Sequence, residues 1–126
     1  MKLLDGKSAI VTGGTRGIGR GIVKTFAEHG ANVVFTYMSS EEKAKALAEE
    51  LEALGVKALP MRSDAADYAS AEKLVAATNE AFGTVDIVVN NAGITRDGLL
   101  MRMTEEQWDI VVNTNMKSVF NLTKAV

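Results

Sequence analysis

The stretch that decides the fold is SAIVTGGTRGIGR, residues 8–20, where a short apolar run leads through glycines into a helical pattern. Glycine loses more backbone freedom on folding than any other residue, so Gly13, Gly17 and Gly19 in one turn need a reason. We predict a strand over residues 8–12, a glycine turn and then a helix. The N-terminus of such a helix offers free N–H groups and a positive dipole end to a phosphate. A tight turn without a ligand is the alternative.

Three further apolar runs, at residues 32–37, 56–61 and 86–90, have the length and composition of strands buried on both faces. Between them lie helical patterns with one apolar face, which Gly30, Gly55 and Gly83 end. We expect the apolar faces to be formed by Ile18, Ile22 and Phe26 in the first helix, Ala44, Leu47, Ala48, Leu51 and Leu54 in the second, and Leu74, Val75, Ala81 and Phe82 in the third. Alternation of this kind predicts an α/β fold, a doubly wound parallel sheet.

Composition limits the possible functions. With 126 residues and 47% hydrophobic residues we expect one domain over residues 1–126. Fourteen Lys and Arg against 16 Asp and Glu, scattered along the chain, argue against binding to nucleic acid or to an anionic membrane. No cysteine is present and no run is long enough to cross a bilayer, so we expect a cytoplasmic protein without a thiolate metal site.

Two motifs together carry a resemblance. Thr12-Gly-x-x-x-Gly17-x-Gly19 and NNAG at residues 90–93 follow two of the expected strands, and the chain resembles the short-chain dehydrogenase/reductase family along its whole length. The stretches NNAGITRD and LLMRM are similar to those of bacterial 3-oxoacyl-[acyl-carrier-protein] reductases. The resemblance implies a Rossmann-type sheet with strand order 3-2-1-4, from which the C-terminal strands of the family are missing.

The choice of cofactor can be argued from the residues. NAD-binding sheets place a carboxylate at the end of the second strand, where it holds the ribose 2′-hydroxyl. Here that position lies within TYMSS, residues 36–40, which is not acidic. Arg16 in the glycine turn can donate charge-assisted hydrogen bonds to a 2′-phosphate, although an exposed cation without a partner is the alternative. We therefore predict NADPH over NADH.

The resemblance also implies cofactor-binding residues. They are Gly13, Thr15, Arg16, Gly17, Ile18 and Gly19 in the turn, Asp64 at the adenine, and Asn90, Ala92 and Gly93 beside the ribose. Asp64 could instead be a carboxylate at the start of a helix. Asn90 and Asn91 could instead serve turn formation, because asparagine bonds readily to nearby backbone.

Catalysis in the family uses a serine and a Tyr-x-x-x-Lys motif. Tyr37 and Tyr68 are followed four places later by Glu41 and Glu72, so neither fits the motif. The resemblance places the family's Ser, Tyr and Lys beyond Val126. Asn115 matches the asparagine that positions a water in the proton relay, with a helix kink or cap as its alternative role.

The expected function follows from these residues and the resemblance. It is NADPH-dependent reduction of a 3-oxoacyl thioester, carried by acyl carrier protein, to the 3-hydroxyacyl form in fatty acid biosynthesis. This chain would supply the cofactor-binding half, inactive alone, of a homo-oligomer that is a tetramer in the family. An inactive NADP(H)-binding or interaction module is the alternative, and no metal site is expected.

Overall fold

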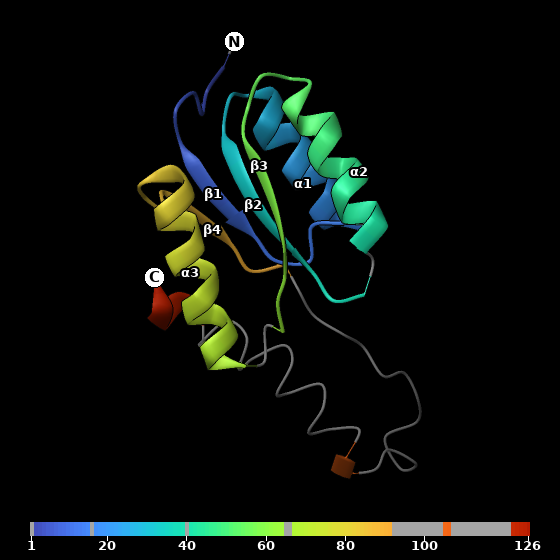
Figure 1. The fold of residues 1–126 in the computed structure, drawn as a ribbon, viewed down its shortest axis with the longest axis vertical. Helices are drawn as coiled ribbons and strands as arrows, with labels where there is room; N and C mark the ends of the chain where they lie inside the picture. The colour runs from blue at the N-terminus through green and yellow to red at the C-terminus, as the bar shows by residue number, and fades with distance from the viewer. Residues whose placement is uncertain (1, 16, 40, 65–66, 92–104, 107–121) are drawn as a thin grey trace.

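The computed structural model describes residues 2–15, 17–39, 41–64, 67–91, 105–106 and 122–126. Strands and helices alternate along them: β1 (Ser8–Val11), α1 (Gly17–Glu28), β2 (Asn32–Tyr37), α2 (Glu41–Glu52), β3 (Ala58–Arg62), α3 (Tyr68–Phe82) and β4 (Ile87–Val89). Figure 1 shows the strands side by side, with helices on both sides of the sheet they form.

The sheet is parallel and its order is β3-β2-β1-β4, which confirms the predicted order of these strands. Ser8 is in register with Asn32 on β2, and Ala9 with Ile87 on β4. The chain moves outward from β1 through β2 to β3 and then returns to place β4 on the other side of β1. The point between β1 and β4 is therefore the topological switch point, where doubly wound sheets bind ligands at the carboxyl ends of their strands.

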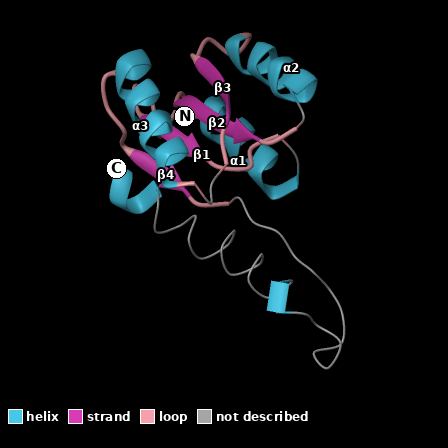
Figure 2. Ribbon diagram, turned by 60° about the horizontal axis from the view of Figure 1, so that its bottom comes forward, coloured by secondary structure: helices cyan, strands magenta, loops and turns pink. Residues whose placement is uncertain are grey.

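Figure 2 shows helices on opposite sides of the sheet. Successive side chains of a strand point to opposite faces, so each buried strand packs on helices on both sides. Val11, Val33 and Phe35 are completely buried against α1 and α2. Ile10 and Val34 point the other way and form a second cluster with α3 and with Leu122. Both faces of β1 and β2 are thus covered, and this explains why their sequences are continuously apolar.

The face of α1 differs from the prediction. Its buried residues are Gly19, Val23 and Ala27, whereas Ile18 is 78% exposed; Ile22 and Phe26 are only partly buried at the edge of the cluster. The spacing was right but the face was displaced by one residue, because small side chains let the helix approach the sheet closely. In α3, Leu74 and Val75 are buried as predicted and Phe82 is partly buried, but Ala81 is exposed. In α2 the prediction holds except at Leu54, which follows the helix and is 45% exposed.

Strand ends also differ from the prediction. β1 ends at Val11, β3 runs over Ala58–Arg62, and β4 covers only Ile87–Val89. Pro60, the proline of the sequence, lies on β3 at the edge of the described sheet. Lys57 O and Ser63 N both bond to β2, so the alternation of the ladder turns the nitrogen of Pro60 to the open edge, where no donor is needed.

Helix ends follow the glycine signals. Gly30, Gly55 and Gly83 have φ of 92°, 93° and 85°, the left-handed conformation that favours glycine. The N-cap of α3 is Asp67, whose carboxylate accepts hydrogen bonds from Ala69 N at 3.2 Å and from Ser70 Oγ at 3.0 Å. The capping-box pattern Thr104-Glu-Glu-Gln107 also predicts a helix from Thr104 onward, which lies mostly outside the described residues.

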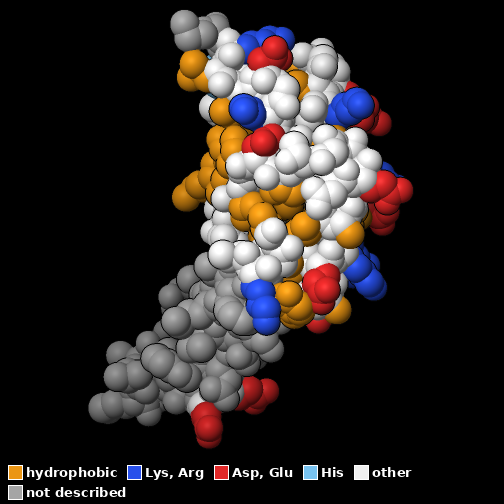
Figure 3. Space-filling view, turned by 90° about the vertical axis from the view of Figure 1, so that its left-hand side faces the viewer, with side chains coloured by type: hydrophobic (Ala, Val, Ile, Leu, Met, Phe, Trp, Pro, Cys, Tyr) orange, Lys and Arg blue, Asp and Glu red, His pale blue; other side chains and the backbone are white. Residues whose placement is uncertain are grey.

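Charges of both signs are interspersed on the face drawn in Figure 3, with apolar side chains between them. None of the helices described is long and apolar enough to cross a membrane.

Candidate cofactor site at the carboxyl ends of the strands

The turn after β1 is held in place by two side chains from distant parts of the chain. Thr36, near the end of β2 and 3% exposed, accepts a hydrogen bond from Gly13 N through its Oγ1 at 2.9 Å. Asn91, just after β4, donates from Nδ2 to the carbonyl oxygen of Gly13 at 3.1 Å. Both backbone polar groups of Gly13 are therefore used inside the protein, and Gly13 itself has φ of +67°.

Thr12 connects the same turn to β4. Its backbone N donates to Val89 O at 3.1 Å, and its hydroxyl oxygen accepts from Asn91 N at 3.0 Å. The ends of β1, β2 and β4 are thereby joined by hydrogen bonds around the glycine turn. A turn fixed in this way needs no rearrangement to present its outer surface to a ligand.

Two glycines in the turn allow close packing. A Cβ on Gly14 would lie 2.6 Å from Phe35 Cβ and 2.9 Å from Val23 Cγ2, so this residue lets β2 and α1 come together. A Cβ on Gly19 would overlap the Gly13 carbonyl oxygen and approach Asn91 Nδ2 to 2.5 Å. The absence of a side chain at Gly19 therefore lets α1 pack directly against the turn.

Other residues of the turn face outward. Gly17 has φ of +58° and open space where a Cβ would be, and Ile18 next to it is 78% exposed. These residues begin α1, where helical geometry leaves the amides of the first turn without intrahelical acceptors. No acidic side chain lies in that turn. The arrangement suits an anion.

The other predicted site residues are distributed as follows. Asp64 is exposed, two residues after the end of β3, and the helix-start role that was its alternative belongs to Asp67 instead. Asn90 is exposed directly after β4. Asn91 serves the turn, which was the alternative considered for this pair. Arg16, Ala92, Gly93 and Asn115 lie outside the described residues, and so do the predictions made for them.

Sequence analysis did not single out Thr36 and Asn91 for the part they play. A polar residue at the end of a buried strand was the available signal, but the partner of each lies 23 or 78 residues away. It also missed a hollow of about 380 Å³ beside the turn, between α1 and α2. Thr15, Gly17, Arg20, Lys43, Ala46, Leu47 and Glu50 line it. In the part of the chain described, no group of acidic or histidine side chains is arranged to hold a metal ion.

Comparison with known proteins places this geometry in a family. The model of the family described as short chain dehydrogenase matches residues 7–126. The chain belongs to this family. The parallel sheet and the order of its strands agree with the fold that the resemblance to this family implied.

Curated short chain dehydrogenase relatives include two reductases of similar identity. The 3-oxoacyl-[acyl-carrier-protein] reductase FabG of Staphylococcus aureus (strain Mu50 / ATCC 700699) is 50% identical over 115 residues, which are 91% of this chain and 47% of that protein. The enzyme of the same name from Escherichia coli (strain K12) is 50% identical over 122 residues, or 97% of this chain and 48% of that protein. The chain spans about half the length of these relatives.

Solved structures agree with the fold. A short chain dehydrogenase from Burkholderia cenocepacia J2315 in complex with NADP has a TM-score of 0.93 at 44% identity, covering 97% of this chain and 50% of that chain. A blue fluorescent protein from a metagenomic library in complex with NADPH has a TM-score of 0.91 at 41% identity, with the same coverage.

Proposed function

We propose that this chain binds NADP(H) at the carboxyl ends of its strands. The observation that carries the proposal is the glycine turn between β1 and α1. It is fixed from inside by Thr36 and Asn91 and presents the first turn of α1 outward without an acidic side chain. Its position at the topological switch point of a parallel sheet is where dinucleotides bind.

The residues present fit the phosphorylated form of the cofactor. The pyrophosphate would lie at the amides of Gly17 and Ile18, which the open space at Gly17 leaves accessible. The residues after β2, Met38 and Ser39, carry no negative charge that would repel a 2′-phosphate. Two solved relatives are complexes with NADP or NADPH, which supports the same choice here. The roles of Arg16, Asp64, Asn90, Ala92 and Gly93 in this site are part of the proposal.

We further propose that the protein reduces 3-oxoacyl thioesters, with acyl carrier protein as the carrier and fatty acid synthesis as the setting. The names of the curated relatives support this reading. When bound, the nicotinamide supplies a hydride to the carbonyl carbon. Asn115 would position a water in the proton relay, and the Ser, Tyr and Lys of the family would come from residues after Val126. Assembly into a homo-oligomer and a cytoplasmic location belong to the same proposal.

The alternative is an NADP(H)-binding module without catalysis. The sequence has two tyrosines. Tyr37 is the last residue of β2 and is in register with Arg62 on β3. Tyr68 is the first residue of α3, and the Nζ atom of Lys124 lies 5.6 Å from the centroid of its ring. Neither has a lysine four residues later. Neither tyrosine therefore fits the family's catalytic pattern.

The test starts with the intact protein as its own cell makes it. Its mass shows whether the chain continues beyond 13.5 kDa. Titration with NADPH and NADH, followed by cofactor fluorescence, should give a dissociation constant for NADPH at least about tenfold lower, the weight of one charge-assisted contact to the 2′-phosphate. Equal constants would contradict the cofactor proposal.

Activity then separates the two functions. Oxidation of NADPH in the presence of an acetoacetyl thioester supports the reductase, and its loss in Asn115→Ala with unchanged NADPH binding supports the role of Asn115. Tight NADPH binding without turnover, in a protein of 13.5 kDa, would support the binding module. Sedimentation of the same preparation measures its oligomeric state.

A further inference from the structure

The hollow between α1 and α2 adjoins the proposed cofactor site. Thr15 and Gly17 of the glycine turn line one part of it, and Arg20, one turn further along α1, lines another. Lys43 and Glu50 reach it from α2. Because the same hollow borders the turn that would hold the pyrophosphate, a group attached to the adenosine ribose can be close to Arg20 and Lys43.

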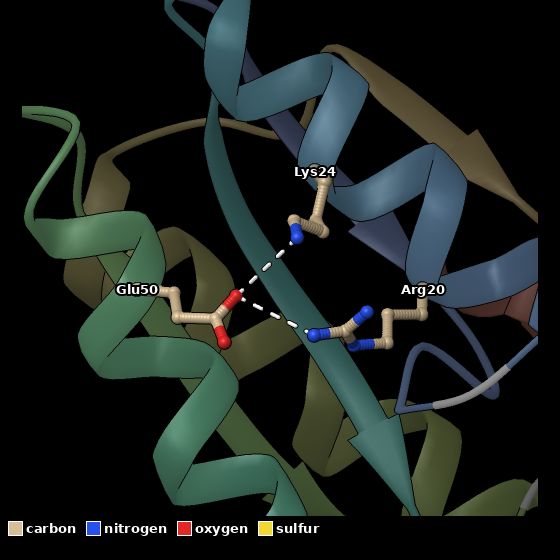
Figure 4. A network of polar contacts seen from close by, with 3 residues as sticks. All are labelled: Arg20, Lys24 and Glu50. Carbon is tan, nitrogen blue, oxygen red and sulfur yellow. Dashed lines mark hydrogen bonds and ion pairs between the residues drawn. The ribbon is translucent and has the colours of Figure 1, made fainter.

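The charges around the hollow are predominantly positive. Glu50 Oε2 lies 3.5 Å from Arg20 Nη2 and 3.5 Å from Lys24 Nζ, so one carboxylate serves two cations (Figure 4). Figure 4 shows both cations reaching from α1 toward Glu50 on α2. Lys43 forms no ion pair within the described ranges, whereas Lys45 on the same helix pairs with Glu41 at 3.3 Å. A dianion entering the hollow would therefore meet uncompensated positive charge.

Arg20 is suited to receive such an anion. Its bond to Glu50 is long, at 3.5 Å, and its side chain is 43% exposed, so the contact is weak and other guanidinium donors are available. If Arg20 turned toward an anion, Glu50 would keep Lys24 as a partner. The network can thus release Arg20 without leaving a carboxylate alone.

We propose that Arg20, assisted by Lys43, contacts the adenosine 2′-phosphate of the cofactor and so determines the preference for NADP(H) over NAD(H). This inference rests on the proposed function, because it assumes that the dinucleotide binds at the glycine turn. The proposal assigns part of the discrimination between NADP(H) and NAD(H) to residues of α1 and α2 beyond the glycine turn, in addition to Arg16.

The experiment uses two probes that differ only in the group of interest. Adenosine 2′,5′-bisphosphate carries the 2′-phosphate and adenosine 5′-monophosphate lacks it, so the ratio of their dissociation constants isolates that group. Calorimetric titration of the intact protein gives the ratio for the wild type. For Arg20→Gln we expect the preference to fall about tenfold, and for Lys43→Gln about threefold, with binding of the monophosphate unchanged.

Lys45→Gln is the matched control, since it removes one positive charge from α2 outside the lining of the hollow. It should change the preference less than about twofold, because an exposed charge without direct contact to the anion is screened by salt. Arg20→Lys keeps the charge and should retain a preference between those of the wild type and Arg20→Gln. Thermal unfolding of each variant verifies that it is folded.

The outcomes distinguish the proposal that the protein prefers NADP(H) from the proposal that Arg20 contacts the 2′-phosphate. If the wild type prefers the bisphosphate and Arg20→Gln behaves like Lys45→Gln, the role of Arg20 is wrong while the cofactor proposal stands. If the wild type binds both probes equally, the NADP(H) proposal fails and the role of Arg20 fails with it.

Discussion

Gly19 is the residue at which the glycine turn leaves no room for a side chain. A methyl group there would collide with the Gly13 carbonyl oxygen and with Asn91 Nδ2, two atoms that already bond each other at 3.1 Å. Neither can yield without straining the hydrogen bond that joins the turn to Asn91. We expect Gly19→Ala to lower the free energy of unfolding by about 2 kcal/mol, measured by urea denaturation.

Gly21→Ala is the matched control for this substitution, because Gly21 lies in the same helix with nothing within 4 Å of the added Cβ. There the better helix propensity of alanine should stabilise the protein by roughly 0.5–1 kcal/mol. The two variants should therefore change stability in opposite directions. A loss of the same size in both would mean that the contact at Gly19 is not the cause.

The sequence predicts the glycine turn but not the different structural role of each glycine in it. Gly17 and Gly19 are both glycines of the same motif, but their surroundings differ. Gly17 faces open space, whereas Gly19 packs on Gly13. The same limit applies to Thr36 and Asn91, whose contacts with Gly13 arise only when strands distant in sequence become neighbours. The local sequence indicates which residues form the turn. The contacts that hold the turn in place depend on which strands become neighbours in the sheet.

At the scale of elements, α1 shows how a correct period can indicate the wrong face. Large apolar residues recur at Ile18, Ile22 and Phe26, but the smaller Gly19, Val23 and Ala27 pack on the sheet. A helix that starts in a tight turn must approach its sheet closely, and hydrophobicity alone does not register that requirement. For α2 the interior apolar pattern was sufficient, since Ala44, Leu47, Ala48 and Leu51 are buried as expected.

The start of α3 depends on one side chain. Asp67 Oδ1 accepts from Ala69 N and Oδ2 accepts from Ser70 Oγ. Asp67→Ala removes both acceptors, and we expect it to lower the free energy of unfolding by about 1 kcal/mol, as for other N-caps. Chemical denaturation measures the change. Asp67→Asn keeps an acceptor for Ala69 N and should lose less than half as much; an equal loss would assign the effect to charge instead of capping.

On the scale of the whole molecule, parallel pairing followed from the alternation of elements, since helical crossovers require it. The order of the strands followed from the family resemblance. The sequence did not predict which residues complete the core on the sheet face that packs against α3. Leu122 is 3% exposed and joins the cluster that Ile10, Val34 and Leu74 form between the sheet and α3. Residues 122–125 are helical, so the last described segment contributes to the core from a position 33 residues after β4 ends.

Leu122→Ala tests whether this second face unfolds together with the first. The change removes a buried side chain between three elements, and we expect a loss of about 2–4 kcal/mol, measured by urea denaturation. Leu54→Ala is the control, because Leu54 is 45% exposed and should lose less than about 1 kcal/mol. A single transition displaced to lower urea means that both clusters belong to one cooperative unit, as their shared strands β1 and β2 require. An early separate transition in Leu122→Ala would show instead that the face under α3 opens while the glycine turn stays folded.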